Sequence, residues 1–160
     1  MKGHFYLTSL LLNKLKNSNE SRIIVLTCRD YSKGEINFND LNSSKNYDKE
    51  LAYNQSKLAN VLFTTELMKR LEGHDVTVNC VDPGYVYTDL MKNSSVYRSP
   101  YSPISFMMKL FLKTPFMGAQ PVIFASVSPR LNNVSGKLIK YTKNFFKFID
   151  IFNYEIFVFF

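Results

Sequence analysis

A tyrosine and a lysine four residues apart are the side chains of this sequence best suited to moving a proton. They lie in the segment Tyr53-Asn54-Gln55-Ser56-Lys57, and a spacing of four puts both on one face of a helix, one turn apart. A phenol with its ordinary pKa of about 10 is a poor proton donor at neutral pH, and a nearby ammonium lowers that pKa by stabilising the phenolate. The pair is a candidate general acid, although the same spacing also arises by chance on exposed helices.

The sequence gives no indication of metal or disulfide chemistry. Its two cysteines, Cys28 and Cys80, cannot build a disulfide framework, and with only His4 and His74 beside them no metal-ligand spacing is formed. We therefore expect no metal site, and we expect an intracellular, reducing compartment.

The elements that must position the tyrosine and the lysine follow from the spacing of apolar residues. Leucines at helical spacing predict helices over 4–16 and 49–71, with Gly73 at the end of the second. The apolar runs 23–26 and 76–81 are typical of strands buried on both faces. The other expected elements are a loop over 29–49 with an extended piece at 36–41, a loop over 85–103, helices at 104–112 and 118–127, and a last strand at 137–141. Helices that alternate with apolar strands predict an α/β fold with a parallel sheet.

The predicted order of elements brings the chemistry to one edge of the sheet. The first strand leads into Cys28, and the second is followed by Asp82-Pro83-Gly84, with the Tyr53 helix between the two strands. Ligands of α/β sheets bind beyond the carboxyl ends of the strands. We therefore expect the end of the first strand, the Tyr53 helix and the Pro83-Gly84 turn to converge on one crevice.

Several stretches of the sequence resemble a known family. The chain resembles the short-chain dehydrogenases/reductases, and within them the retinol dehydrogenase branch, collinearly from about residue 3 to residue 141. The matching stretches are Gly3-His4-Phe5 with Leu7-Thr8, Ser21-Arg22-Ile23, residues 34–41 (GEINFNDL), residues 52–63 (AYNQSKLANVLF), residues 70–73 (RLEG), residues 76–79 (VTVN), residues 83–88 (PGYVYT), Gly118-Ala119-Gln120 and Ser135-Gly136-Lys137.

The resemblance implies a Rossmann-type fold and an oxidoreductase that interconverts a carbonyl and an alcohol on a lipophilic substrate, a retinoid or a lipid aldehyde. NADP(H) or NAD(H) would be the cofactor. By resemblance, Tyr53 passes a proton to the carbonyl oxygen, and Lys57 holds the ribose hydroxyls and lowers the tyrosine pKa. The segment from Pro83 to Thr88 would line the nicotinamide, so the cofactor-binding residues would be Tyr53, Lys57, Pro83, Gly84, Val86 and Thr88.

Three departures from the family pattern put independent activity in doubt. The glycine-rich cofactor loop is absent, so the sheet is expected to lack its leading βαβ strands and the chain to hold a dinucleotide weakly on its own. The family's catalytic asparagine would fall just upstream of Met1. Its substrate-orienting serine aligns with Cys28, whose thiol is a weaker donor. Cys28 is either a catalytic donor or a small residue without a role, and Thr27 could substitute only if the strand end twists.

The chain divides at about residue 141 by composition. Residues 1–141 are expected to form the C-terminal part of a short-chain dehydrogenase domain, and residues 142–160 a Phe-rich, basic tail of unclear structure. Residues 1–90 carry as many basic as acidic residues, so all of the net charge of +7 lies in residues 91–160. The basic residues there are spaced singly among apolar ones, which argues against nucleic acid binding. The two interpretations left open are peripheral contact with an internal membrane and a solvated surface in the cytoplasm.

A non-catalytic function is the alternative to the reductase. Without leading strands, the strand at 23–26 has an unpaired edge, and such edges recruit another chain. The chain would then be a fragment or an interaction module that forms oligomers through the exposed sheet edge.

Overall fold

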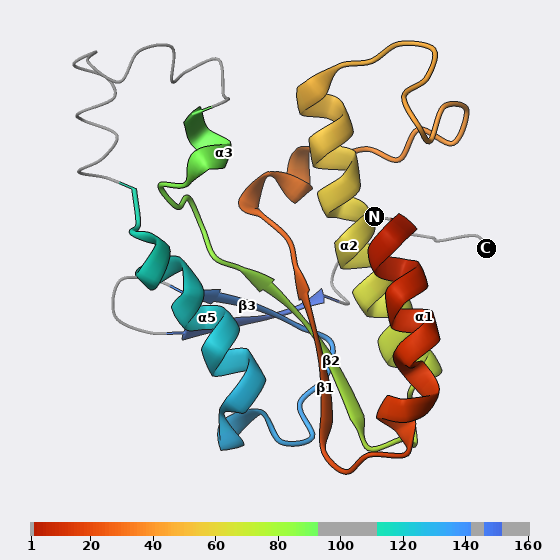
Figure 1. Cartoon of the computed structure of the whole chain (residues 1–160), viewed down its shortest axis with the longest axis vertical. Helices are drawn as coiled ribbons and strands as arrows, with labels where there is room; N and C mark the ends of the chain where they lie inside the picture. The colour runs from red at the N-terminus through yellow and green to blue at the C-terminus, as the bar shows by residue number, and fades with distance from the viewer. Residues whose placement is uncertain (1, 93–111, 142–145, 152–160) are drawn as a thin grey trace.

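The fold is a four-stranded sheet with helices on both faces, as the computed structural model of residues 2–92, 112–141 and 146–151 shows (Figure 1). The strand order is β1 (Ser21–Leu26), β2 (Val76–Asp82), β3 (Lys137–Tyr141) and β4 (Phe146–Asp150). β1, β2 and β3 are parallel, and β4 is antiparallel to β3. The helices α1 (Lys2–Lys16) and α2 (Lys49–Arg70) cover one face and α5 (Pro115–Val127) covers the other. This confirms the predicted parallel α/β, Rossmann-type architecture.

Helix α2 carries the tyrosine and the lysine, and local signals at its two ends fix its length. The Asp48 side chain accepts a hydrogen bond of 2.8 Å from the Leu51 amide at the first turn. Leu71 caps the other end, and Gly73 follows with a φ of 82°, a conformation that glycine adopts without strain. The helix predicted over 49–71 is therefore confirmed, as is the helix predicted over 4–16.

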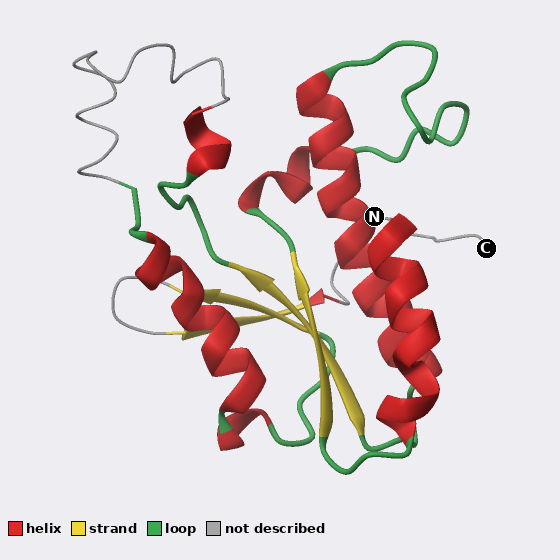
Figure 2. Ribbon diagram, viewed as in Figure 1, coloured by secondary structure: helices red, strands yellow, loops and turns green. Residues whose placement is uncertain are grey.

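The core has two layers, one on each face of the sheet. Successive side chains of β2 point to opposite faces and so contribute to both layers. Val76 and Val78 pack with Phe63 and Leu67 of α2, whereas Val81 packs with buried side chains on the α5 face, namely Ala125, Leu131 and Ile139. Figure 2 shows the sheet between these helices. All residues of β2 except Thr77 are buried, as predicted for a central strand.

The first strand is less buried than its apolar sequence predicts. Every residue of β1 is half-buried except Leu26, which is 44% exposed. The prediction of burial on both faces is wrong for this strand because β1 pairs only with β2 among the described residues and lies at the edge of the sheet. A run of Ile, Ile, Val and Leu indicates strand structure but does not say how many neighbours the strand has.

Elsewhere the predicted boundaries shift for identifiable reasons. The loop after β1 starts as a short 3₁₀ helix, η1 (Arg29–Lys33), and no strand forms at 36–41. Helix α5 starts three residues earlier than predicted, because the Thr114 hydroxyl caps it and Pro115 is well suited to the first turn. A single-turn helix, α3 (Asp89–Lys92), lies in the expected loop over 85–103. The helix expected at 104–112 lies outside the described residues except for Leu112.

Two further elements complete the described fold. A short 3₁₀ helix, η2 (Pro129–Leu131), follows α5. β4 lies in the stretch for which the sequence suggested only a Phe-rich tail, and it pairs with all five residues of β3. None of the helices in the described ranges is both long and apolar enough to cross a bilayer.

Candidate active site

Tyr53 and Lys57 meet on one face of the first turns of α2. The Lys57 ammonium lies 5.5 Å from the centre of the Tyr53 ring, and both side chains are half-buried. The regular helix at this point is sufficient to place them, because residues four apart lie one above the other. The shared face predicted from the spacing is confirmed.

The pKa of Tyr53 moves in the opposite direction to the one the resemblance implied. The pKa of Tyr53 is raised to about 12, mainly by burial and in smaller part by the neighbouring Cys28 thiol and the Asp30 and Asp82 carboxylates. The expected lowering by Lys57 is therefore wrong for this geometry. The ammonium lies over the face of the ring, where it makes a cation–π contact, and desolvation of the phenolate dominates. Tyr53 is thus a protonated donor throughout the neutral range.

Cys28 and Thr27 follow β1 and differ in what they contact. Cys28 is half-buried and close enough to Tyr53 for its thiol to affect the tyrosine pKa. Thr27 is buried, and its hydroxyl donates a 3.0 Å hydrogen bond to the backbone carbonyl of Lys57. The Thr27 hydroxyl therefore ties the strand to α2 rather than standing in for a substrate-orienting serine.

The turn after β2 is built around Asp82. Its carboxylate Oδ1 accepts a 2.8 Å hydrogen bond from the Gly84 amide, and Gly84 has a φ of 78°, in the left-handed region that favours glycine. Asp82 is only 1% exposed, and its second oxygen, Oδ2, is buried without a hydrogen-bond partner. Such an oxygen has the capacity to accept a hydrogen bond from a ligand or water.

Lys113 covers this turn from the loop before α5. Its ammonium donates a 3.0 Å hydrogen bond to the Pro83 carbonyl, and a Cβ on Gly84 would stand 2.9 Å from that ammonium. Burial lowers the pKa of Lys113, as does the positive charge of Arg29, whereas Asp82 acts in the opposite direction. Val86 forms an isolated parallel bridge with Lys113, and Thr88 is exposed. The segment expected to line the nicotinamide is therefore held against α5.

A polar contact joins the ends of β1 and β2. The Tyr85 hydroxyl donates a 3.2 Å hydrogen bond to Asp30, which also pairs with Lys33 at 3.0 Å. The Arg29 guanidinium lies over the Tyr85 ring, 5.5 Å from its centre. The two strand ends predicted to converge with the Tyr53 helix are thus linked directly, and Tyr53 is within electrostatic range of both.

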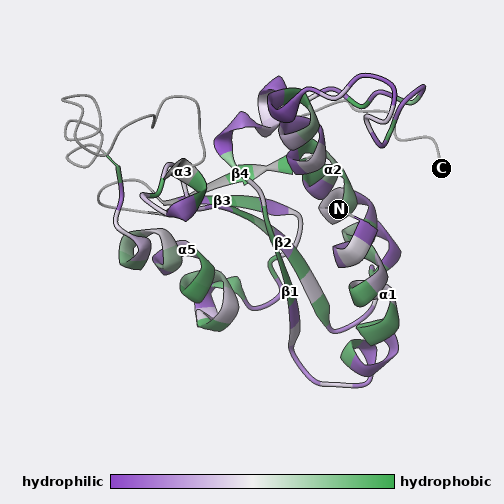
Figure 3. Cartoon of the chain, turned by 45° about the horizontal axis from the view of Figure 1, so that its top comes forward, coloured by the Kyte–Doolittle hydropathy of each residue, from purple (hydrophilic) through white to green (hydrophobic). Residues whose placement is uncertain are grey.

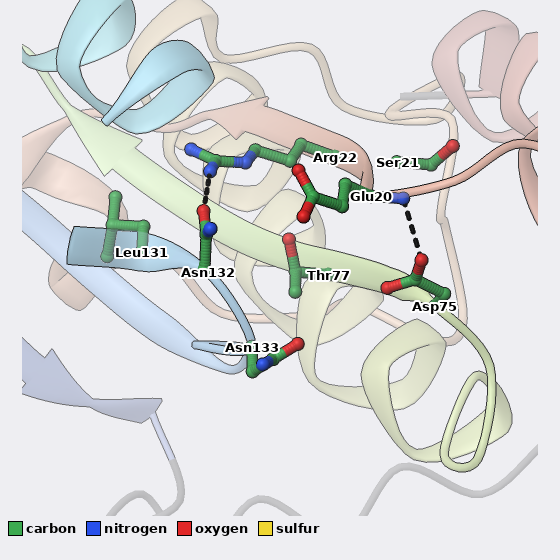
Figure 4. A pocket seen from close by; sticks show the side chains of 8 residues that line it. All are labelled: Glu20, Ser21, Arg22, Asp75, Thr77, Leu131, Asn132 and Asn133. Carbon is green, nitrogen blue, oxygen red and sulfur yellow. Dashed lines mark hydrogen bonds between the residues drawn. The ribbon is translucent and has the colours of Figure 1, made fainter. Parts of the chain in front are cut away.

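A small polar pocket lies at the opposite, amino-terminal end of the strands (Figure 4). Its volume is about 120 Å³, and Arg22 and Asp75 are among its lining residues. The Arg22 guanidinium donates to the carbonyls of Ala125 and Ser128 and to the Asn132 side chain. These groups hold loops together, and none of the catalytic or cofactor-binding residues predicted from the sequence lines this pocket. No group of three or more His, Cys, Asp or Glu side chains suited to a metal occurs in the part of the chain that the structure describes.

Two polar side chains in the buried elements have structural contacts. The Asn60 side chain donates to the Leu26 carbonyl, and the Asn79 side chain bonds to Val134 and Lys137. Asp82 and Lys113 were not recognised as part of the site. The Asp-Pro-Gly turn was a signal for Asp82, whereas nothing in the local sequence connects Lys113 to a turn thirty residues away.

The residues present fit the nicotinamide end of a dinucleotide. The side of Gly84 on which a Cβ would stand is occupied by the flexible end of the Lys113 side chain rather than by backbone. The unpartnered Asp82 oxygen lies at the same strand end. No described segment provides the glycine-rich loop at a helix N-terminus that would hold the pyrophosphate, and no such loop occurs in the sequence.

Comparison with known proteins agrees with this geometry. Residues 1–98 match the family model described as short chain dehydrogenase. Retinol dehydrogenase 14 of Mus musculus is 47% identical over 135 residues, and these cover 84% of this chain and 40% of the mouse protein. Retinol dehydrogenase 13 of Mus musculus is 48% identical over 140 residues, covering 84% and 41%. The chain thus spans about 40% of the length of these relatives.

Solved structures agree with this chain in fold. A short chain dehydrogenase from Salmonella enterica has a TM-score of 0.64 at 18% identity, over 88% of this chain and 49% of that one. A second solved structure, from Mycobacterium paratuberculosis, has a TM-score of 0.61 at 30% identity, over 86% and 42%. Tyr53 and Lys57 lie within the part of the chain that the family model matches, and the chain belongs to the short chain dehydrogenase family, with retinol dehydrogenases among its relatives.

Proposed function

We propose that this chain carries the proton-transfer part of a retinol dehydrogenase-like site, which reduces the carbonyl of a lipophilic substrate, a retinoid or a lipid aldehyde. The observation that carries the proposal is the Lys57 ammonium over the Tyr53 ring, beside Cys28 at the carboxyl ends of the parallel strands. NADP(H) rather than NAD(H) is proposed from the resemblance to retinol dehydrogenases.

Tyr53 acts as the general acid in this mechanism. Its hydroxyl donates a proton to the carbonyl oxygen; the raised pKa keeps that hydroxyl protonated at neutral pH but makes it a weaker acid than a free phenol. When bound, a nicotinamide cofactor would supply the hydride for the carbonyl carbon. Lys57 is positioned to hold the ribose hydroxyls while its charge offsets negative charge that develops on Tyr53. Cys28 orients the carbonyl with its thiol, a weaker donor than a hydroxyl.

The proposal includes low activity of the 160 residues by themselves. A dinucleotide is held mainly by its pyrophosphate, for which the described residues offer no cradle. We expect a fluorescence titration to give weak NADPH binding, with a dissociation constant above about 1 mM, which is equivalent to about 4 kcal/mol of binding free energy or less.

A chimera tests the proposed function. The part of mouse retinol dehydrogenase 14 that precedes its matched region is fused upstream of residue 1, and NADPH oxidation with a long-chain aldehyde is followed. We expect aldehyde-dependent turnover by the chimera and none by the upstream part alone. A folded chimera that binds NADPH but reduces no retinoid or lipid aldehyde would show that the proposal is wrong.

A second candidate function is an interaction module that pairs through β1. The observation that favours it is the half-buried β1, which lies at the edge of the described sheet with Leu26 exposed. Light scattering coupled to size exclusion tests this function. Oligomers that become monomers when Ile24→Pro blocks the edge would support it, with Leu10→Pro on α1 as the control for nonspecific damage. A monomer at all concentrations would count against it.

A further inference from the structure

Lys113 holds the segment after β2 at three points. Its ammonium donates a 3.0 Å hydrogen bond to the Pro83 carbonyl. Its backbone amide donates to the Tyr85 carbonyl at 3.0 Å, and its own carbonyl accepts from the Tyr87 amide at 2.9 Å. The backbone of Lys113 therefore fixes the two tyrosines, whereas Pro83 depends on the lysine side chain.

The helix that follows Lys113 gives these contacts a fixed base. The Thr114 hydroxyl caps α5 by accepting a 3.2 Å hydrogen bond from the Met117 amide. Near the start of α5, the buried Gly118 packs directly on Val86, because a Cβ on this glycine would stand 2.5 Å from a methyl carbon of the valine. Lys113 thus extends from a helix that is itself docked on the segment it binds.

The peptide group between Pro83 and Gly84 is held at both of its ends. Lys113 binds the carbonyl oxygen of this group, and the Asp82 carboxylate accepts a 2.8 Å hydrogen bond from its amide. Gly84 has a φ of 78°, and glycine adopts φ values of either sign at little cost. The glycine alone would let the peptide group rotate, so the two hydrogen bonds are what fixes its orientation.

The helix itself does not account for a lysine at position 113. The N-terminus of a helix carries a partial positive charge, which disfavours a cation. Burial lowers the pKa of Lys113, as does the charge of Arg29, although Asp82 acts in the opposite direction. None of the 13 residues of α5 is charged, and Figure 3 shows hydrophilic colouring just before a largely hydrophobic helix. The contacts across to the segment after β2 explain the lysine better than helix stability does.

We propose that Lys113 is a positioning residue, which fixes the orientation of the peptide group between Pro83 and Gly84 and so sets the affinity of the site for the nicotinamide end of the cofactor. The inference rests on the proposed function, because that function puts the nicotinamide against residues 83–88. Lys113 acts through the backbone and takes no part in proton transfer. A lysine that only stabilised the fold would not affect one end of the cofactor more than the other.

The first experiment measures amide hydrogen exchange by NMR in the 160-residue chain without cofactor. Lys113→Met removes the ammonium but keeps both backbone hydrogen bonds, Lys113→Arg restores a donor, and Lys14→Met at an exposed position of α1 is the matched control. Exchange at Gly84 should be at least about tenfold faster in Lys113→Met, because its peptide group is then held at one end only. Exchange at Thr27, whose amide bonds to the Val81 carbonyl, should stay unchanged in all variants.

The second experiment uses the chimera with the upstream part of mouse retinol dehydrogenase 14 and calorimetric titration. NADPH is compared with 2′-phospho-ADP-ribose, which lacks the nicotinamide. Lys113→Met should raise the Kd of NADPH about tenfold and leave that of 2′-phospho-ADP-ribose unchanged. Lys113→Arg should recover most of the lost affinity. Because a general loss of stability would weaken both ligands, the comparison separates positioning from folding.

Two results would overturn the proposal: exchange at Gly84 that is the same in Lys113→Met and the parent, or equal losses of affinity for the two ligands. A chimera in which Lys113→Met weakens NADPH alone, but which reduces no retinoid or lipid aldehyde, would support the role of Lys113 and contradict the proposed function. A chimera that reduces the aldehyde and binds NADPH equally well with and without the lysine would contradict the role of Lys113 alone.

Discussion

The two ends of the same parallel strands differ in what their polar groups do. At the amino-terminal end, Arg22 and Asp75 form hydrogen bonds with neighbouring loops. The pocket there is lined by these same structural groups. At the carboxyl-terminal end, Tyr53 is protonated and half-buried, and Asp82 keeps an unpartnered oxygen. The carboxyl-terminal end is therefore suited to catalysis because its polar groups can still form hydrogen bonds with a ligand. The polar cavity lies at the other end and does not mark the site.

The geometry of a parallel sheet explains this division. Each strand of the βαβ unit leads into the next helix from its carboxyl end, so the segments after β1 and β2 lie at one edge with the first turns of α2. The segments at the amino-terminal edge only connect each helix to the strand that follows it. The comparison predicts that substitutions at the carboxyl end change chemistry and those at the amino end change stability.

The largest expected effect is that of Lys57→Met in the chimera with the upstream half of mouse retinol dehydrogenase 14. Turnover should fall by about 10²–10⁴-fold, because both the ribose contact and the positive charge beside Tyr53 are lost. The melting temperature should change little, since Lys57 is half-buried and keeps its aliphatic stem as methionine. Lys69→Met in the last turn of α2 is the matched control. Equal losses of turnover in the two variants would show that Lys57 has no specific role in the site.

At the amino end, Arg22→Met should destabilise the chain by about 2 kcal/mol. The arginine side chain donates to the backbone carbonyls of Ala125 and Ser128, and its loss removes both hydrogen bonds, although the Ser128 carbonyl still accepts from the Leu131 amide. Urea denaturation measures the change. Turnover of the folded chimera should stay within about twofold of the parent, and a selective loss of turnover would contradict the division between the two ends.

The sequence predicted the elements with strong periodicity and the pairing of Tyr53 with Lys57, because both depend on local spacing. It did not predict that β1 is only half-buried, since burial depends on which strands flank it. Lys113 was missed because its contact with Pro83 crosses thirty residues of chain. The direction of the Tyr53 pKa was wrong because spacing shows that two groups meet but not that one is desolvated.

Thr27→Val tests the contact between the end of β1 and helix α2 and should lower the free energy of unfolding by about 1 kcal/mol. The buried Thr27 hydroxyl donates to the Lys57 carbonyl, and valine preserves the shape while removing the donor. Thermal denaturation gives the free energy change. Ser44→Val in the exposed loop before α2 serves as the control for a lost hydroxyl.

The smallest effect concerns alkaline pH. Because the pKa of Tyr53 is raised from about 10 in the unfolded chain to about 12 in the folded chain, its neutral form is favoured by folding. The resulting stability is fully present below pH 10 and is lost as pH rises from 10 to 12. The difference in phenolate absorbance between the parent and Tyr53→Phe should therefore titrate near pH 12. A midpoint at or below pH 10 would show that stabilisation of the phenolate by Lys57 outweighs the effect of burial on the pKa of Tyr53.

The most direct test of the account is Tyr53→Phe in the chimera, assayed for NADPH-dependent reduction of a long-chain aldehyde together with NADPH binding and melting temperature. Loss of the hydroxyl should lower turnover by at least about 10²-fold while binding and melting temperature stay unchanged, because only the proton donor is removed. Turnover that persists at the parent rate would contradict the assignment of Tyr53 as the proton donor.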